Sequence, residues 1–358
     1  MNIKMQPKVF SLIPIIFIVF MYGCNSKNIE NDTGDNYSKE SIISTITESL
    51  AKEEIPFIFK FHSKGETISG GVNVVSEKDR FLIGSITKMF TATLILELHS
   101  KGFLSIDDPV NTYIEEYTFS DDVKIRHLLN HTSGLRDSET NIAYLAYVNP
   151  YEKLTLEQVV EESTTFTTNR EYVYSNTGFL MLGRIIEIVT GQSYNAYLDK
   201  QIIKRLNLTN TCMVGFHEDC SPIKGYVNLK TFEDLDDSKK ANLDMGKKYD
   251  QLDSYDAFVS VAGSAGALAS NADDVETFID NLKNDYFFDF DLMLEGEGEY
   301  RNGIFDYGNG IYGHSAGTVD SSAQLIFSGK QDQFFIFTVG DVHFPAQVAV
   351  DIMSTFLK

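Results

Sequence analysis

The sequence has 358 residues, 43% of them hydrophobic, and a formal net charge of −21 at pH 7. This length and composition allow a sizeable core, either in one large domain or in two lobes. The strong negative charge, with no basic patch beside aromatic residues, argues against nucleic acid as a partner.

Residues 1–23 have the pattern of a secretory signal peptide. Two lysines precede an apolar run, residues 9–22, which contains a proline and is shorter than the roughly 20 residues of a membrane-spanning helix. The run ends at a Gly-Cys pair that resembles the lipobox of bacterial lipoproteins, so we expect a lipid on Cys24. Residues 24–40 are polar and are expected to form a flexible linker to that anchor. The expected location is the bacterial cell envelope, with the lipid-anchored protein facing the periplasm or the exterior.

The folded part is expected to cover residues 41–358. Strand-like patterns over residues 55–73 and 324–339 lie near its two ends, with helical patterns over residues 41–51 and 345–357 beside them. The middle of the chain has a mainly helical pattern. We therefore predict an α/β fold of the α+β sandwich type. One antiparallel sheet from both ends would be flanked by helices, with an inserted helical lobe and the site in the cleft between them.

An S-x-x-K pattern, Ser85 to Lys88, stands at the start of a strongly apolar segment. Residues 89–98 are apolar on nearly every face and Gly102 follows as a C-terminal cap, which is typical of a helix buried in the core of a large domain. Ser85 would lie in the first turn, near unpaired backbone N–H groups, with Lys88 on the same face. Burial would lower the pKa of the lysine, as a general base requires. The pattern thus indicates a serine nucleophile activated by a lysine.

Two further features concern metals and disulfides. His127 and His131 have the i, i+4 spacing of helical metal ligands, but no third ligand and no H-E-x-x-H pattern accompany them. We therefore expect no metal and no other cofactor. Cys212 and Cys220 would be able to form a disulfide outside the cytoplasm, and two buried thiols are the alternative.

Ser315 lies within G-H-S-A-G, which matches the G-x-S-x-G nucleophile elbow of α/β-hydrolases. The elbow needs a helix directly after the serine, whereas the segment that follows is β-branched and aromatic, which is typical of two hairpin strands. Only His343 follows as a possible base. An α/β-hydrolase that uses Ser315 is therefore the weakest of three functional hypotheses, and the other two are given below.

Five segments, in order, resemble the serine β-lactamase and penicillin-binding-protein superfamily, in its branch of class C-like β-lactamases, D-peptidases and related esterases. They are GSITKMFTATLILELHSKGFLSIDDPV, KIRHLLNHTSGL, YSNTGFLMLGRIIEIVTGQSYNAYL, AGSAGALASNADDVETFI and GHSAG, and they span most of residues 81–317. The resemblance implies the β-lactamase/transpeptidase-like fold, in agreement with the architecture predicted above. It also implies an acyl-serine intermediate.

By this resemblance Ser85 is the acylated nucleophile, Lys88 is its proton partner, and Tyr174 matches the tyrosine that acts as general base. Which of the two takes the serine proton stays open. Asn176 would hydrogen-bond the substrate amide or hold Lys88.

The same resemblance makes GHSAG the family's third motif, on the strand that edges the site. His314 would bind the carboxylate of the substrate or steady the catalytic tyrosine, and Ser315 would line the pocket. The N–H of Gly317 would form the oxyanion hole with that of Ser85. The sequence departs from the family at Ala316, where relatives commonly have glycine, and this bears on oxyanion geometry and substrate range.

We therefore expect an exported serine hydrolase that acts on D-amino-acid peptides, β-lactams or small esters. The expected partner is a small-molecule or peptide substrate. The alternative is a catalytically inactive relative that binds cell-wall peptides or a partner, and the loss of glycine at position 316 is the main argument for it. Neither the oligomeric state nor the choice among these substrates follows from the residues.

Overall fold

The computed structural model of this protein describes residues 55–63, 65–72, 74, 79–117, 119–120, 122–135, 137, 155–163, 170–225 and 255–340. The expected signal peptide, Cys24, the linker and the helices over residues 41–51 and 345–357 lie outside the described residues and stay predictions. No described helix is both long enough and apolar enough to span a membrane.

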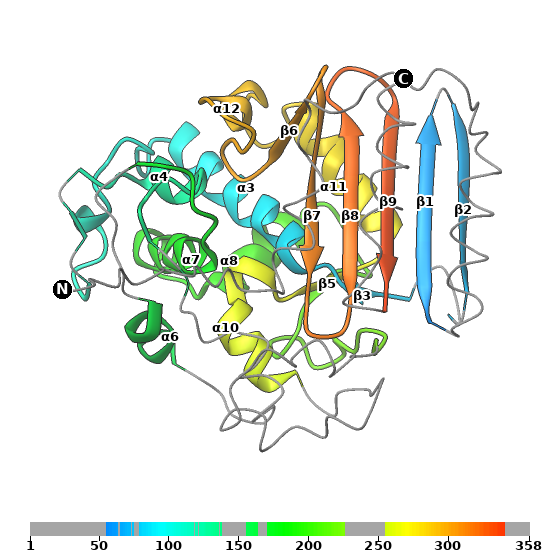
Figure 1. Ribbon diagram of the computed structural model, residues 1–358, viewed down its shortest axis with the longest axis horizontal. Coiled ribbons are helices and arrows are strands. Elements are labelled where there is room, and N and C mark those ends of the chain that lie inside the picture. The colour runs from blue at the N-terminus through cyan, green and yellow to red at the C-terminus, as the bar shows by residue number, and fades with distance from the viewer. Residues whose placement is uncertain are drawn as a thin grey trace, which may run out of the picture.

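Six antiparallel strands from the two ends of the described chain form the main sheet, in the order β2-β1-β9-β8-β7-β6 (Figure 1). They are β1 (Phe57–Ser63), β2 (Glu66–Val72), β6 (Phe305–Gly308), β7 (Ile311–Gly317), β8 (Ser322–Ser328) and β9 (Gln333–Val339). The N-terminal hairpin joins the C-terminal strands where β1 pairs with β9, with Phe59 opposite Phe337. The predicted antiparallel sheet built from both ends is confirmed.

Helix α11 (Ala272–Lys283) packs against β1 and β9. Its buried apolar residues have the i, i+3, i+4, i+7 spacing of one helical face, and they are Val275, Phe278, Ile279 and Leu282. The helix begins after Asn271, whose side chain accepts the N–H of Asp274. The charged groups of its first turns, which include Asp273 and Glu276, form ion pairs with Lys60 of β1.

The other helices form a lobe beside the sheet (Figure 1). They are α3 (Thr87–Ser100), α4 (Ile125–Leu129), α6 (Leu156–Ser163), α7 (Asn176–Thr190), α8 (Tyr194–Leu198), α10 (Asp256–Gly266) and α12 (Asp291–Leu294), and α8 continues as a π-helical turn over Asp199–Ile203. α3 is the most deeply placed, because every residue from Thr87 to Leu98 is buried. The helix predicted over residues 89–98 is thus confirmed, and both α7 and α10 pack against it.

The C-terminal end of α10 is fixed to both of these neighbours. A Cβ atom at Gly183 of α7 would lie only 2.3 Å from Ser264 Oγ, so the two helices need a glycine where they meet. Ser264 Oγ donates to the carbonyl of Phe179 at 2.9 Å, and the carbonyl of Ser264 accepts from Thr91 Oγ1 at 2.6 Å. The residue that follows Ser264 therefore has a fixed position relative to α3.

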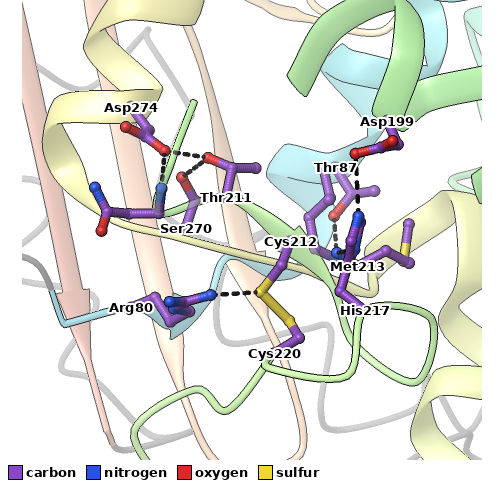
Figure 2. Close-up of a disulfide and its surroundings, with 12 residues drawn as sticks. Arg80, Thr87, Asp199, Thr211, Cys212, Met213, His217, Cys220, Ser270 and Asp274 are labelled. Carbon is purple, nitrogen blue, oxygen red and sulfur yellow. Dashed lines mark hydrogen bonds and ion pairs between the residues drawn. A yellow bond between two sulfur atoms is a disulfide. The ribbon is translucent and has the colours of Figure 1, made fainter. Parts of the chain in front are cut away.

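A second sheet of three short strands, in the order β3-β5-β4, joins β3 (Phe81–Leu82), β5 (Leu268–Ser270) and β4 (Cys212–Met213). Cys212 forms a disulfide with Cys220, so the first of the two alternatives for this pair is confirmed. Figure 2 shows Arg80 donating to the sulfur of Cys212, at 3.0 Å. It also shows His217, inside the loop that the disulfide closes, bonded to Asp199 at 3.1 Å. The disulfide thus ties the loop that contains His217 to β4, which pairs with β5 directly after α10.

Candidate active site

Ser85 lies in a tight turn immediately before α3. Residues Gly84–Ile86 form one turn of 3-10 helix that runs directly into the α-helix, and Ser85 is buried there. Gly84 has a φ of +46°, and a Cβ atom on it would lie 2.9 Å from Thr318 Cγ2 and 3.0 Å from the carbonyl oxygen of Gly317. The turn that carries the serine therefore packs against the end of β7, which carries the third motif.

Lys88 follows three residues later and is completely buried. Its Nζ donates to Ser85 Oγ at 3.1 Å, to Asn176 Oδ1 at 2.7 Å and to the carbonyl of Ala265 at 2.8 Å. An ammonium group has three hydrogens, so these acceptors satisfy it fully. Both the Ser85–Lys88 pair and the contact of Asn176 with the lysine, expected from the sequence, are present.

Two of these acceptors are fixed by helix ends. Asn176 is the first residue of α7, directly after the N-cap residue Ser175. Ala265 lies near the end of α10, beyond a kink at Gly263, where φ is +35°. The carbonyl groups of a final helical turn have no partner within the helix, which leaves that of Ala265 available to Lys88.

Burial lowers the pKa of Lys88 to about 7, and the negative charge of Asp137 opposes this effect. At neutral pH a fraction of the molecules then carries a neutral amine at this position. A neutral amine has two hydrogens, which Asn176 Oδ1 and the carbonyl of Ala265 can accept, so that its lone pair faces Ser85 Oγ. This arrangement is suited to removal of the serine proton.

Tyr174 lies beside both residues. Its hydroxyl hydrogen-bonds with Ser85, and Lys88 Nζ lies 5.0 Å from the centroid of its ring. Burial of the hydroxyl raises the pKa of Tyr174 well above its ordinary value, and the bond with Ser85 opposes this rise only in part. The side chain is therefore a neutral phenol near pH 7, a state in which it can donate a proton.

His131 holds the segment that carries Tyr174. Its carbonyl accepts the N–H of Val173 at 2.9 Å, its Nδ1 accepts that of Ser175 at 3.1 Å, and the centroid of its ring lies 4.2 Å from that of Tyr174. Since Nδ1 is an acceptor, the neutral ring carries its proton on Nε2. That buried nitrogen has no hydrogen-bond partner in the described part of the chain. His131 thus holds the backbone of the residues directly before and after Tyr174.

His314, in the middle of β7, is buried and uses both of its ring nitrogens within the protein. Nδ1 donates to the carbonyl of Ser315 at 2.6 Å, and Nε2 accepts from the hydroxyl of Tyr300 at 2.9 Å. Burial, together with the nearby charge of Lys88, lowers the pKa of His314 to about 3. The ring of Tyr300 lies against that of Tyr174, at a centroid distance of 6.1 Å. The ring of His314 contacts that of Tyr174 edge-on, at a centroid distance of 6.5 Å, and it also reaches Tyr174 through Tyr300. Neither of its ring nitrogens is free for a substrate carboxylate.

The GHSAG segment forms β7 and turns directly into β8, with Ser315 opposite Gln324. The expectation that strands follow this segment, instead of the helix of a nucleophile elbow, is confirmed. Ala316 is one of the residues that a side chain at Gly84 would contact, and Gly317 ends β7 at the same place. The residue that departs from the family pattern therefore lies against the turn that carries the serine.

The two histidines with metal-ligand spacing have other bonds. His127 Nδ1 accepts the backbone N–H of Lys124 at 3.1 Å and so caps α4, while His131 makes the contacts given above. Across the described ranges, no group of three or more His, Cys, Asp and Glu side chains could hold a metal ion.

Three side chains of the site could not be assigned from sequence patterns. The H-T-S-G-L segment marks His131 as part of a turn, but its contacts with the tyrosine segment depend on a left-handed backbone, with φ of +59°. Tyr300 lies in an irregular loop before β6 and meets His314 only through the fold. Asp137 reaches the start of α7 from 39 residues before Asn176. Short motifs carry no signal for such contacts.

The chain is similar in sequence to known proteins. A sequence model of the family described as Beta-lactamase matches residues 64–302. N-acetylmuramyl-L-alanine amidase of Bacillus subtilis (strain 168) is 26% identical over 245 residues, which is 63% of this chain and 52% of that protein. The chain spans about half or less of the length of the curated relatives that it matches.

Two solved structures illustrate the structural likeness. The D-stereospecific amidohydrolase from Streptomyces sp. has a TM-score of 0.70 at 23% identity, and the match covers 88% of this chain and 98% of that one. The D-amino acid amidase from Ochrobactrum anthropi SV3, complexed with D-phenylalanine, has a TM-score of 0.72 at 19% identity, with coverage of 88% and 98%. At these identities the likeness shows the fold alone, and it confirms the predicted architecture.

Proposed function

This chain belongs to the Beta-lactamase family, and from that premise we propose that it is a serine hydrolase that forms an acyl-enzyme on Ser85. The observation that carries the proposal is the geometry of Lys88. Two of its hydrogen bonds go to acceptors fixed by helix ends, and the third goes to Ser85 Oγ. A base in hydrogen-bond reach of the nucleophile, with its pKa near the working pH, meets both requirements of general base catalysis.

In the proposed reaction Ser85 Oγ attacks the substrate carbonyl while its proton passes to the neutral Nζ of Lys88. The C–N or C–O bond then breaks, and the leaving amine or alcohol takes that proton back from Lys88. Tyr174 is placed to relay it, because its hydroxyl contacts Ser85. Water hydrolyses the acyl-enzyme by the same steps in reverse. The backbone N–H groups of Ser85 and Gly317 are the proposed oxyanion hole, supported by the contact between the serine turn and the end of β7.

We expect the substrate to carry no carboxylate in the part that lies next to His314. Lys88 is committed to three protein acceptors, and both nitrogens of His314 are committed to Ser315 and Tyr300. A substrate carboxylate would gain no free cation from these two residues, whereas an amide or ester needs none. D-Amino-acid amides and small esters therefore fit the site better than β-lactams or peptides with a free carboxylate. The D-amino acid amidase that shares this fold is consistent with such substrates.

The test is covalent labelling followed by intact mass measurement, with a fluorophosphonate and, separately, a labelled penicillin. With the fluorophosphonate we expect peptide mapping to place the adduct on the peptide that contains Ser85, and we expect the adduct to be lost in Ser85→Ala and retained in the matched variant Ser315→Ala. Penicillin, which has a free carboxylate, should label the protein more weakly. An adduct on Ser315 would restore the elbow hypothesis. Absence of an adduct with both reagents, together with no turnover of amides or esters, would favour the inactive relative that binds cell-wall peptides.

Export to the cell envelope, through a lipid on Cys24, is also part of the proposal and rests on the sequence alone. Incorporation of labelled palmitate into the full chain, and its loss in Cys24→Ala, is the expected result. Incorporation that persists in the variant would place the lipid elsewhere.

A further inference from the structure

Asp137 accepts hydrogen bonds from three consecutive residues at the start of α7. The backbone N–H groups of Asn176 and Thr177 donate to its carboxylate, each at 2.9 Å. The side-chain hydroxyls of Ser175 and Thr177 also donate to it, at 3.2 Å and 3.1 Å. The first N–H groups of a helix have no partner within it, and the helix dipole favours a negative charge beside them. These four bonds fit a helix cap supplied from another part of the chain.

A fifth bond connects Asp137 to the catalytic residues. The amide nitrogen of the Asn176 side chain donates to Asp137 Oδ2 at 2.8 Å. An amide has one donating end and one accepting end, so this bond leaves Oδ1 to accept from Lys88, at 2.7 Å. If the amide turned by half a rotation, its NH₂ group would face the ammonium of Lys88, and two donors would oppose each other. The bond to Asp137 selects the first orientation.

We propose that Asp137 is a positioning residue of this active site, which orients the Asn176 amide so that its oxygen holds Lys88 against Ser85. The proposal rests on the acyl-serine function proposed above. The Asn176 amide lies between Asp137 and Lys88, so Asp137 has no direct hydrogen bond with Lys88 or Ser85 among the described contacts. Its effect passes through three hydrogen bonds in turn. They join Asp137 Oδ2 to Asn176 Nδ2, Asn176 Oδ1 to Lys88 Nζ, and Lys88 Nζ to Ser85 Oγ.

The charge of Asp137 gives a second, measurable consequence. It is the group that opposes the effect of burial on Lys88, so its removal lowers the pKa of the lysine further. The other titratable groups that face Lys88 are Tyr174, His131 beside it and His314 on β7, and burial keeps all three uncharged near pH 7. No other carboxylate contributes to the pKa of Lys88 among the described residues.

The first test compares Asp137→Asn with Asp107→Asn. Asp107 is an exposed carboxylate that binds Arg126 at 2.7 Å, so its loss removes the same charge without touching Asn176. For Asp137→Asn we expect kcat for a D-amino-acid amide to fall about 10- to 100-fold with KM within about twofold, and the midpoint of the acidic limb of the pH profile to move to lower pH. Asp107→Asn keeps the wild-type midpoint. A variant Asp137→Asn that lost only thermal stability, with an unchanged midpoint, would reduce Asp137 to a helix cap and overturn the proposal.

A double-mutant cycle tests the route of the effect. If Asp137 acts through Asn176, the double variant with Asn176→Ala is about as slow as Asn176→Ala alone, whereas multiplicative losses would contradict the proposal. Should Asp137→Asn fail to fold, Asp137→Glu takes its place, since it keeps the charge and alters the reach of the carboxylate. Its expected signature is a lower kcat with the wild-type midpoint.

Failure of the proposed function is separable from failure of this inference. If the wild-type protein formed no acyl-enzyme, the function would be wrong, but an NMR titration of the Lys88 side chain still decides the role of Asp137. We expect the lysine to titrate at lower pH in Asp137→Asn than in the wild type and in Asp107→Asn. Identical midpoints in all three proteins would overturn the inference.

Discussion

Lys88 is a buried lysine whose three direct hydrogen-bond partners are all uncharged. Removal from water disfavours an ammonium ion, and neutral acceptors compensate for this less than a direct carboxylate contact would. The only carboxylate that acts on it within the described structure, Asp137, is one amide group away. This separation accounts for a pKa near 7, which makes the residue a usable base, where a direct ion pair would keep it protonated.

The residue-scale prediction is therefore a pH profile. With Lys88 in its proposed role as base, the neutral amine is the active form. The value of kcat/KM should then rise with pH and level off above a midpoint near 7, losing about tenfold per pH unit on the acidic side. Tyr174 adds no limb in this range, since burial raises its pKa. Initial rates from pH 5 to 9 with an uncharged ester measure the profile. Lys88→Arg, which cannot lose its proton, is the control and should lose activity at every pH. A rate that decreased as the pH rose through 7 would contradict the assignment of Lys88 as base.

At the scale of elements, the site depends on the turn that connects β3 to α3. The chain leaves β3 at Leu82, forms the turn with Gly84 in a left-handed conformation, and enters a helix with no polar cap before it. The atoms of β7 and of the turn after it leave no room for a side chain at Gly84. The position of Ser85 therefore depends on a glycine that is next to it and on a strand from the far end of the chain.

A glycine substitution tests this dependence against an internal control. Gly84→Ala adds a methyl group 2.9 Å from Thr318 Cγ2 in a left-handed backbone, whereas Gly102, with a φ of +74°, has nothing within 4 Å of its would-be Cβ atom. Gly102→Ala should cost about 1–2 kcal/mol of unfolding free energy, for the backbone conformation alone. Gly84→Ala should cost more, about 2–4 kcal/mol with the overpacking added, and should lower kcat/KM at least tenfold. Urea denaturation and kinetics on both variants measure this, and equal effects on activity would show that the turn is not coupled to the site.

The disulfide between Cys212 and Cys220 also acts at the scale of elements. It closes a short loop beside β4, because the two cysteines are eight residues apart in the sequence. Loop-closure entropy in the unfolded chain suggests a contribution of about 2–3 kcal/mol for a loop of this size. The variant with both Cys212→Ser and Cys220→Ser should lose about that much stability. The value of kcat/KM should change less than twofold, since neither cysteine bonds to the side chains of the candidate site among the described contacts. Thermal melts of this variant, and of the wild type under reducing conditions, should agree with each other. A large loss of activity in a still-folded variant would contradict this separation of roles.

At the scale of the whole molecule, much of the arrangement followed from the sequence. The strand-like patterns over residues 55–73 and 324–339 predicted the sheet, and the helix after Ser85 could be recognised because it is apolar on nearly every face. That the side chains of Ser85, Lys88, Tyr174 and Asn176 come together was also predictable, since each of them lies in a short motif. The hydrogen bonding and the lowered pKa of His314 were not predictable. They depend on Tyr300, which lies outside any motif, and on the burial of β7 in the fold. Long-range contacts of this kind are set by packing, and single-residue patterns do not encode them.

The net charge of the whole molecule leads to the last prediction. A formal charge of −21 repels anions over a distance set by the ionic strength, which is about 30 Å at 0.01 M salt and about 8 Å at 0.15 M. We compare a D-dipeptide that has a free C-terminal carboxylate with the same peptide as its C-terminal amide. The amide should react faster at low salt, and kcat/KM of the acid should rise several-fold between about 0.01 and 0.3 M sodium chloride, because salt screens the repulsion. The value for the amide should stay nearly constant, which controls for effects of salt on the enzyme itself. An acid substrate that reacted faster than its amide at low salt would mean that a cation binds the carboxylate in the site, and the proposed preference for uncharged substrates would be wrong.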